Sequence, residues 1–131
     1  MGIDSALAAE DYCYVRTTGR VTGRPHEIEI WFAAQGAASS ADTASAGTIY
    51  ILAGNRHASD WVKNGKREPL VTVRIADVTF DGRMRIVEAA DEDALARRLL
   101  LAKYAPSNDG LEGWGRTALP VAIDLSPAAG E

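Results

Sequence analysis

The sequence predicts a mainly β fold, a small antiparallel β-barrel of about six strands that carries two helices. Six segments have the composition of strands, and most are joined by links short enough for hairpins. These strands do not alternate with long helices, which argues against a doubly wound parallel sheet. Closure into a barrel is favoured because it removes exposed strand edges. At 131 residues, the chain is expected to form one domain, residues 1–131.

Two strands are expected near the start of the chain, over residues 12–18 and 26–32. The first segment is rich in aromatic and β-branched residues. Between the two strands, Gly and Pro interrupt both periodicities over 19–25, which predicts a turn. The second segment alternates polar and apolar residues, so Glu27 and Glu29 should share one face of the strand.

A loop, a strand and a short helix are expected next. Residues 35–48 are small and low in complexity, which predicts a flexible hairpin loop. An apolar strand follows over 48–53. The helical spacing of apolar residues predicts a helix over 58–65, with Asn55 or Ser59 as its N-cap.

Three more strands are expected in the rest of the chain, over 70–75, 78–87 and 119–125. The dipeptide Asp81-Gly82 lies inside the second of these segments. It is typical of a tight hairpin turn, but a bulge in one long strand would also accommodate it. Both interpretations stay open from the sequence.

The clearest helix is predicted over 91–105. Asp91 is a plausible N-cap, acidic residues fill the first turn, and basic residues follow, as the helix dipole favours. An apolar face should point to the barrel: Leu95, Leu99 and Ala102. Residues 106–117 have the composition of a loop.

The charge is unevenly distributed. The chain holds 18 Asp or Glu against 14 Lys or Arg, for a net charge of -4. From Arg16 to Arg74, however, the chain contains eight basic residues and five acidic ones. An acidic protein with one basic centre suggests a discrete anionic ligand and argues against a nucleic-acid surface.

A single cysteine, Cys13, cannot form an internal disulfide, which favours a reducing compartment. The N-terminal residues lack a basic region and a long apolar run, so we expect no signal peptide and no membrane span. A cytoplasmic location is therefore expected, with peripheral membrane association left open. Together with Cys13, the histidines His26 and His57 do not suggest a metal site.

The turn between the first two strands is rich in hydrogen-bond donors. Arg20 and Arg24 each follow a glycine, so the backbone can approach a ligand closely. Guanidinium groups bind phosphate in a bidentate manner. Thr17, Thr18 and Thr22 add hydroxyl groups. We interpret the turn as an anion site, and the alternative is a solvated turn with incidental arginines.

Two further regions are candidates for ligand contacts. The start of the helix near Asn55, Arg56 and His57 could bind an anion or a flat heterocycle through free N–H groups. On residue type alone, a histidine there is more often a cap or surface residue. Around Tyr104 and Trp114, aromatic residues could roof a ring-binding pocket or plug the end of the barrel. No nucleotide-binding or nucleophile motif occurs, so an enzyme of this kind would depend on a bound cofactor.

The ordered set of motifs resembles the deazaflavin-dependent nitroreductase family, also called the nitroreductase/quinone reductase family of flavin and deazaflavin oxidoreductases. The resemblance covers about residues 12–125. The matching pieces are Arg16-Thr17-Thr18-Gly19-Arg20, Gly23-Arg24-Pro25, Glu29-Ile30-Trp31-Phe32, Ala53-Gly54-Asn55, Asp60-Trp61-Val62-Lys63-Asn64, Pro69-Leu70-Val71-Thr72-Val73 and the ending Trp114-Gly115-Arg116-Thr117-Ala118-Leu119-Pro120-Val121.

The resemblance implies a split β-barrel like that of pyridoxamine-phosphate oxidases and the cofactor coenzyme F420, with FMN as the alternative. It implies hydride transfer to a small-molecule acceptor: a quinone, a nitroaromatic compound or an activated enone. A non-catalytic carrier of a cofactor or apolar ligand is the alternative function. A homodimer is plausible by analogy.

The resemblance also implies the site residues. Those expected at the cofactor are Thr18, Arg20, Thr22, Arg24, Asn55, Arg56, His57, Asp60 and Trp61, with the arginines at the phosphate or acidic tail. Those expected at the acceptor are Trp31, Tyr104 and Trp114. The loop at 35–48 is longer than is usual in the family. The family's acceptor-side tyrosines have one counterpart in this sequence, Tyr104, and Trp114 stands near the position of another.

Overall fold

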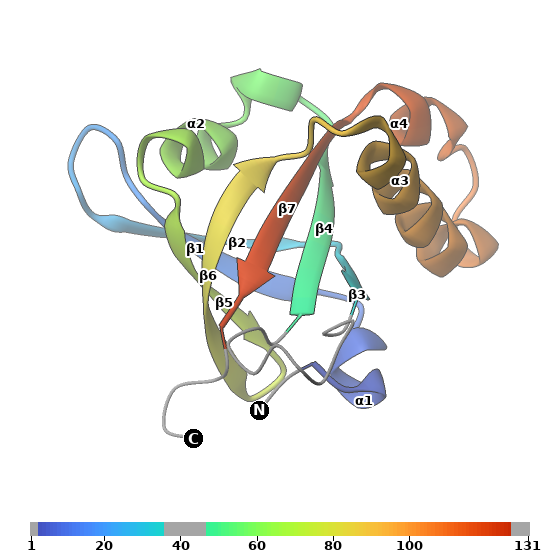
Figure 1. Ribbon diagram of the computed structural model, residues 1–131, viewed down its shortest axis with the longest axis horizontal. Helices are drawn as coiled ribbons and strands as arrows, with labels where there is room; N and C mark the ends of the chain where they lie inside the picture. The colour runs from blue at the N-terminus through green and yellow to red at the C-terminus, as the bar shows by residue number, and fades with distance from the viewer. Residues whose placement is uncertain (1–2, 36–46, 127–131) are drawn as a thin grey trace.

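The computed structural model describes residues 3–35 and 47–126. Its strands form one antiparallel sheet in the order β2-β1-β5-β6-β7-β4-β3 (Figure 1). The strands are β1 (Cys13–Thr18), β2 (Pro25–Ile30), β3 (Ala33–Gln35), β4 (Gly47–Ala53), β5 (Leu70–Ile75), β6 (Val78–Ile86) and β7 (Leu119–Leu125).

The two edge strands of this sheet, β2 and β3, are neighbours in the sequence. Only Trp31 and Phe32 separate them. A sheet whose first and last strands are joined by two residues must curl until its edges meet at that corner. The result is the split barrel that was expected, with seven described strands in place of about six. The expected strand over 26–32 ends at Ile30, and the extra strand is β3, which follows the corner and was not expected from the sequence.

Helices close both ends of the barrel and cover one side of it (Figure 1). Leu7 of α1 and Val62 of α2 both belong to the apolar core inside the barrel. The helices are α1 (Ser5–Ala8), α2 (Asp60–Arg67), α3 (Ala90–Tyr104) and α4 (Glu112–Thr117), with 3₁₀ turns η1 (Arg56–Ala58) and η2 (Ala105–Ser107). Two expectations were wrong in detail. The expected helix over 58–65 begins two residues later, after Ser59, and the expected loop over 106–117 contains α4.

The register of β1 and β2 places alternate residues inside the barrel. Val15 pairs with Ile28, and both contact the apolar core, while the buried Thr17 pairs with the exposed His26. Glu27 and Glu29 share the outer face as predicted. There Arg16 donates to Glu27 over 3.5 Å, and the Tyr14 hydroxyl donates to Glu29 over 2.5 Å.

The segment around Asp81-Gly82 is a continuous strand, so the hairpin alternative was wrong. Both residues lie within β6 and pair with β5 in unbroken register. The hairpin turns instead at Ala76 and Asp77, where Ala76 has a positive φ of 53°. A Cβ on Gly82 would lie 2.6 Å from Cγ2 of Ile123, so glycine lets β6 approach β7 closely.

The expected loop over 35–48 falls mainly on residues 36–46, which lie outside the described residues. Its two ends are strand: Gln35 closes β3, while Gly47 and Thr48 open β4.

A second apolar cluster joins α3 to the outer face of β4 and β7. The buried residues of α3 are Ala96, Leu100 and Tyr104, whereas Leu95 and Leu99 are half-buried and Ala102 is exposed. The predicted face was therefore wrong by about one position. Asp91 is not the N-cap either, because Ala89 holds that position and the Asp91 carboxylate accepts from the Glu92 N–H over 2.9 Å.

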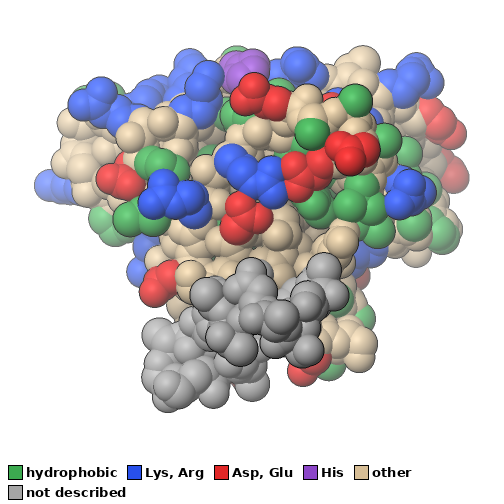
Figure 2. Space-filling model, viewed as in Figure 1, with side chains coloured by type: hydrophobic (Ala, Val, Ile, Leu, Met, Phe, Trp, Pro, Cys, Tyr) green, Lys and Arg blue, Asp and Glu red, His purple; other side chains and the backbone are tan. Residues whose placement is uncertain are grey.

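Arg85 connects the start of α3 to the barrel wall. It donates two hydrogen bonds to Glu92, of 2.6 and 2.7 Å, and two to Asp124, of 2.7 and 3.2 Å. The hydroxyls of Tyr50 and Thr48 complete the set by donating to Glu92 and Asp124. Figure 2 shows basic and acidic side chains side by side in the middle of this face, over β6 and β7.

We predict that Arg85→Met lowers the free energy of unfolding by about 1–2 kcal/mol, because two carboxylates lose charge-assisted bonds at a partly exposed site. Urea denaturation followed by circular dichroism measures the change. Arg83→Met is the matched control, since the exposed Arg83 side chain forms no hydrogen bond or ion pair with the side chains of other described residues. An equal effect of the two substitutions would contradict the prediction.

The same network makes stability depend on pH. Hydrogen bonds from Arg85 hold the pKa of Glu92 below its usual value, although burial opposes them. A lowered pKa means that Glu92 stabilises the fold above the unfolded pKa, about 4.3, and that this stabilisation disappears as the pH falls below it. Between about pH 5 and pH 3, wild-type stability should therefore fall more steeply than that of Glu92→Gln. Parallel slopes in urea titrations would show that Glu92 is not responsible.

Candidate functional site

The β1–β2 hairpin turns through two glycines. The Gly19 N–H donates to the Arg24 carbonyl over 2.8 Å, and the Gly23 N–H donates back to the Gly19 carbonyl over 2.9 Å. Gly23 has a φ of 73°, a conformation that favours glycine. A Cβ on Gly19 would lie 2.7 Å from Nε2 of His26, so glycine allows the close approach of the strands. The hairpin extends beyond the barrel (Figure 1).

Asn64 of α2 fastens this hairpin to the rest of the molecule. Its side-chain oxygen accepts from the backbone N–H of Arg20 over 3.2 Å and from the Arg20 guanidinium over 2.8 Å. Its amide nitrogen donates to the Thr17 hydroxyl over 3.3 Å. Asn64 is 4% exposed and Thr17 is 2% exposed, so both polar groups are satisfied inside the protein.

Asp60 also contacts Arg20, at a distance of 3.3 Å. The Asp60 side chain is 84% exposed, so this ion pair contributes little stability. Arg20 has five N–H donors, and Asn64 and Asp60 engage only some of them. The remaining N–H groups of the guanidinium can donate hydrogen bonds to an anion at the mouth of the pocket.

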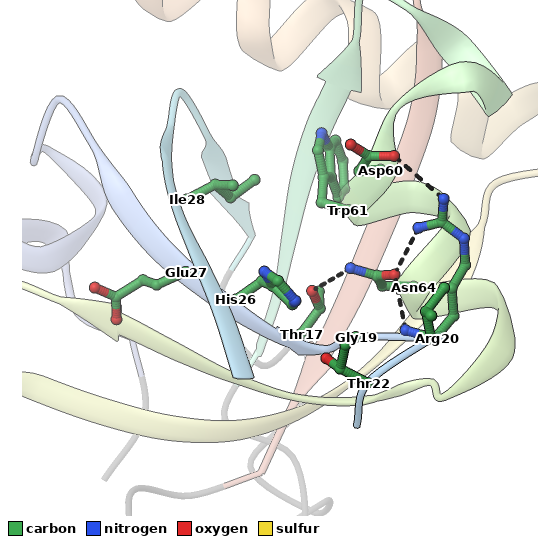
Figure 3. Close-up of a pocket in the computed structure, with 11 residues that line it drawn as sticks. Thr17, Gly19, Arg20, Thr22, His26, Glu27, Ile28, Asp60, Trp61 and Asn64 are labelled. Atoms are coloured by element: carbon green, nitrogen blue, oxygen red, sulfur yellow. Dashed lines mark hydrogen bonds and ion pairs between the residues drawn. The ribbon is translucent and has the colours of Figure 1, made fainter. Parts of the chain in front are cut away.

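A pocket of about 470 Å³ lies next to this cluster. Figure 3 shows Ile28 of β2 pointing toward Trp61 of α2 across it, while Glu27 points away. An apolar slot therefore adjoins the Arg20 guanidinium. The lining residues are Thr17, Gly19, Arg20, Val21, Thr22, His26, Glu27, Ile28, Asp60, Trp61 and Asn64.

Four of the residues expected at the cofactor meet in this pocket: Arg20, Thr22, Asp60 and Trp61. Thr18 lines a neighbouring hollow of about 590 Å³ together with Arg20 and Arg67. Arg24 is exposed on the hairpin and lines neither of these hollows.

The remaining expected cofactor residues lie elsewhere. Asn55 precedes η1 and makes no capping hydrogen bond with its side chain. The Arg56 guanidinium donates to the Thr117 carbonyl of α4, and Nδ1 of His57 lies 3.2 Å from the Lys66 ammonium. None of these three lines the pocket beside Arg20.

The sequence analysis did not single out Asn64 as a site residue. The helical repeat could have identified it, because Asn64 follows Asp60 by four positions and so shares its face of α2. The strand repeat likewise places Thr17 inside the barrel with Val15. Neither pattern alone predicts that Asn64 and Thr17 contact each other.

The three aromatic residues expected at the acceptor lie together at the corner between β2 and β3. The rings of Trp31 and Tyr104 stack with their centroids 4.3 Å apart, and Trp114 meets Trp31 edge-on at 5.8 Å. A pocket of about 450 Å³ opens there, lined by Tyr12, Glu29, Ile30, Trp31, Leu52, Leu111 and Trp114. We call it the aromatic pocket.

Tyr104 supports the aromatic pocket from behind without lining it. It is 5% exposed, and its hydroxyl accepts from the Phe32 N–H over 3.0 Å and donates to the Asp11 carbonyl over 2.7 Å. Burial raises the pKa of this hydroxyl to about 12. Tyr104 therefore fixes the corner and the ring of Trp31, and its proton stays on the hydroxyl at neutral pH.

The two pockets are neighbours along β2. Ile28 lines the pocket beside Arg20, and Ile30 lines the aromatic pocket. Two residues of a strand span about 7 Å, so the linings of the two pockets lie close together. Among the described residues, no cluster of His, Cys, Asp or Glu could hold a metal ion. No helix in the described ranges is long and apolar enough to cross a membrane.

Comparison with protein families matches residues 2–126 to the family described as F420H(2)-dependent quinone reductase. Comparison with curated proteins finds no match.

Several solved structures share the fold. One is described as an F420-H2 dependent reductase (FDR-A), with 18% identity, a TM-score of 0.61, and coverage of 95% of this chain and 97% of its own. An F420 reductase has 14% identity, a TM-score of 0.63, and coverage of 95% and 94%. An FAD-binding protein from Mesorhizobium loti has 14% identity, a TM-score of 0.63, and coverage of 91% and 82%.

We predict that Asn64→Ala lowers the free energy of unfolding by about 2–3 kcal/mol, because it leaves the buried Thr17 hydroxyl and the Arg20 N–H without partners. Chemical denaturation measures this change. Lys63→Ala, at the adjacent exposed position of α2, should stay within about 0.5 kcal/mol of wild type. A neutral Asn64→Ala would mean that the hairpin does not depend on this residue.

Proposed function

Because the chain belongs to the F420H(2)-dependent quinone reductase family, we propose that this F420-dependent reductase transfers a hydride to a quinone. The observation that carries the proposal is the adjacency of two pockets along β2. One has a guanidinium beside an apolar slot, and the other is walled by tryptophans. The first suits an anionic cofactor with a flat ring, and the second suits an apolar acceptor.

The pocket beside Arg20 offers the chemistry that coenzyme F420 requires. The guanidinium, fixed by Asn64, would bind the phosphate or the acidic tail. Trp61 and Ile28 would hold the deazaflavin ring between apolar surfaces. The exposed Arg24 lies on the same hairpin and would contact the more distant part of the tail.

Reduced F420, when bound, supplies the hydride. The protein's part is to place the acceptor and to limit its contact with water. Trp31 and Trp114 would position the quinone ring next to Ile30. A quinone that accepts a hydride also needs one proton to become a hydroquinone. Because the buried Tyr104 hydroxyl keeps its proton and donates it in hydrogen bonds to backbone carbonyls, the proton for the quinone would come from solvent at the open mouth of the pocket.

Each alternative function predicts a different experimental result. A nitroaromatic compound or an activated enone would occupy the same pocket, so an acceptor screen ranks them against quinones. A non-catalytic carrier would bind reduced F420 without its reoxidation when acceptor is added. FMN in place of F420 would give tight FMN binding and a yellow protein. Formation of a homodimer stays a prediction, which gel filtration tests.

We predict that Arg20→Ala raises the dissociation constant for F420 about 10- to 100-fold, through loss of charge-assisted hydrogen bonds. Fluorescence titration of the purified protein with oxidised F420 measures it, with FMN titrated in parallel. Arg83→Ala serves as the control because it removes the same charge on β6, away from the pocket. Unchanged binding by Arg20→Ala would remove the anion site from the proposal.

A further inference from the structure

Among the described residues, one charged side chain lines the aromatic pocket. Of its seven lining residues, Glu29 carries a charge, and the others are aliphatic or aromatic. We propose that Glu29 makes this pocket select planar aromatic acceptors that are neutral or positively charged and reject anionic ones. The inference rests on the proposed function, since it names the class of acceptor for the same reductase.

A hydrogen bond orients the exposed Glu29 carboxylate. The hydroxyl of Tyr14, its cross-strand partner, donates to it over 2.5 Å. Tyr14 is itself held by Arg74, whose guanidinium lies 4.2 Å from the centre of the Tyr14 ring. The negative charge therefore stays at the pocket wall.

Two cations, Arg74 and Lys103, lie in this region but do not line the aromatic pocket. Arg74 lines a different hollow, together with Glu10 and Asp77. The Lys103 ammonium donates to the carbonyls of Glu10 and Phe32, over 2.7 and 2.9 Å, and does not line the aromatic pocket. A ligand in this pocket thus meets a carboxylate with no lining cation.

The walls favour a planar ring. Trp31 and Trp114 are nearly perpendicular, with 85° between their planes, so a ring stacked on one meets the edge of the other. Tyr104 holds Trp31 from behind at an interplanar angle of 6°. Aromatic faces also attract cations, which adds to the effect of the carboxylate.

The two neighbouring pockets thus present different charged groups: Arg20 with its partner Asp60 at the first, and Glu29 at the second. Arg20 lies at the pocket that suits the anionic cofactor, and Glu29 lies at the pocket that suits the acceptor. Because the two lie along one strand, the same carboxylate would also discourage the acidic part of the cofactor from entering the acceptor pocket.

Tryptophan fluorescence can test the inference without any cofactor. The chain contains three tryptophans, and in Trp61→Phe the remaining two, Trp31 and Trp114, both line the aromatic pocket. In this background, naphthoquinone and naphthoquinone sulfonate are titrated separately, and quenching gives the two dissociation constants. We expect the neutral quinone to bind about tenfold more tightly, as expected for one like-charge contact at a partly solvated site.

Glu29→Gln should bring the sulfonate to within about threefold of the neutral quinone and leave neutral binding unchanged. Glu27→Gln is the matched control: it removes the same charge two residues away on β2, outside this pocket, and should keep the tenfold preference. A preference that survives Glu29→Gln, or the absence of quenching by either quinone, overturns the inference.

Failure of the proposed function would look different. If the wild-type protein binds no F420 but shows the Glu29-dependent preference, the cofactor assignment fails and the charge selectivity stands. With F420-loaded protein, the ratio of kcat/KM for neutral and sulfonated quinone should shift in Glu29→Gln by the same factor as the ratio of dissociation constants. An unchanged ratio contradicts the role of Glu29 in acceptor choice.

Discussion

The contact that Asn64 makes between α2 and the β1–β2 hairpin is the constraint on which the candidate site depends. The hairpin extends beyond the barrel, and a lone two-stranded ribbon is marginally stable. Asn64 binds both the backbone and the guanidinium of Arg20, so one buried amide sets where the hairpin lies and where its charge points. The α2 helix can supply that amide because its small Gly65 packs against Met84 of β6.

The opening of the barrel at β2 gives one strand two functions. Its inner residues, Ile28 and Ile30, line two successive pockets. Its outer residue Glu29 is fixed by Tyr14 and also reaches the second pocket. A fully paired strand would have both edges occupied by neighbours. The short corner at Trp31 leaves the β2 edge free of a strand partner among the described residues.

The sequence patterns predicted the strands well where each has a single clear period, as in β1 and β2. They failed where the apolar residues of one element contact two different neighbouring elements. Leucines surround α3 because β4 lies on one side and α4 on another, where Leu101 would lie 2.8 Å from a Cβ on Gly115. Several apolar faces were therefore possible, and the predicted face is off by about one position. Because glycine disfavours helices, α4 was not predicted from the sequence, and tertiary packing stabilises this helix.

The sequence by itself determined the mainly β barrel, the arginine-rich turn, the acidic surroundings and the resemblance to a reductase family, because periodicity, turn chemistry and charge are local properties. Only the tertiary structure decided which residues meet. Arg20 and Asn64 are 44 positions apart in the sequence, and the stacked residues Trp31 and Tyr104 are still farther apart. Such pairs depend on the strand order and on how the sheet curls, which local propensities do not specify.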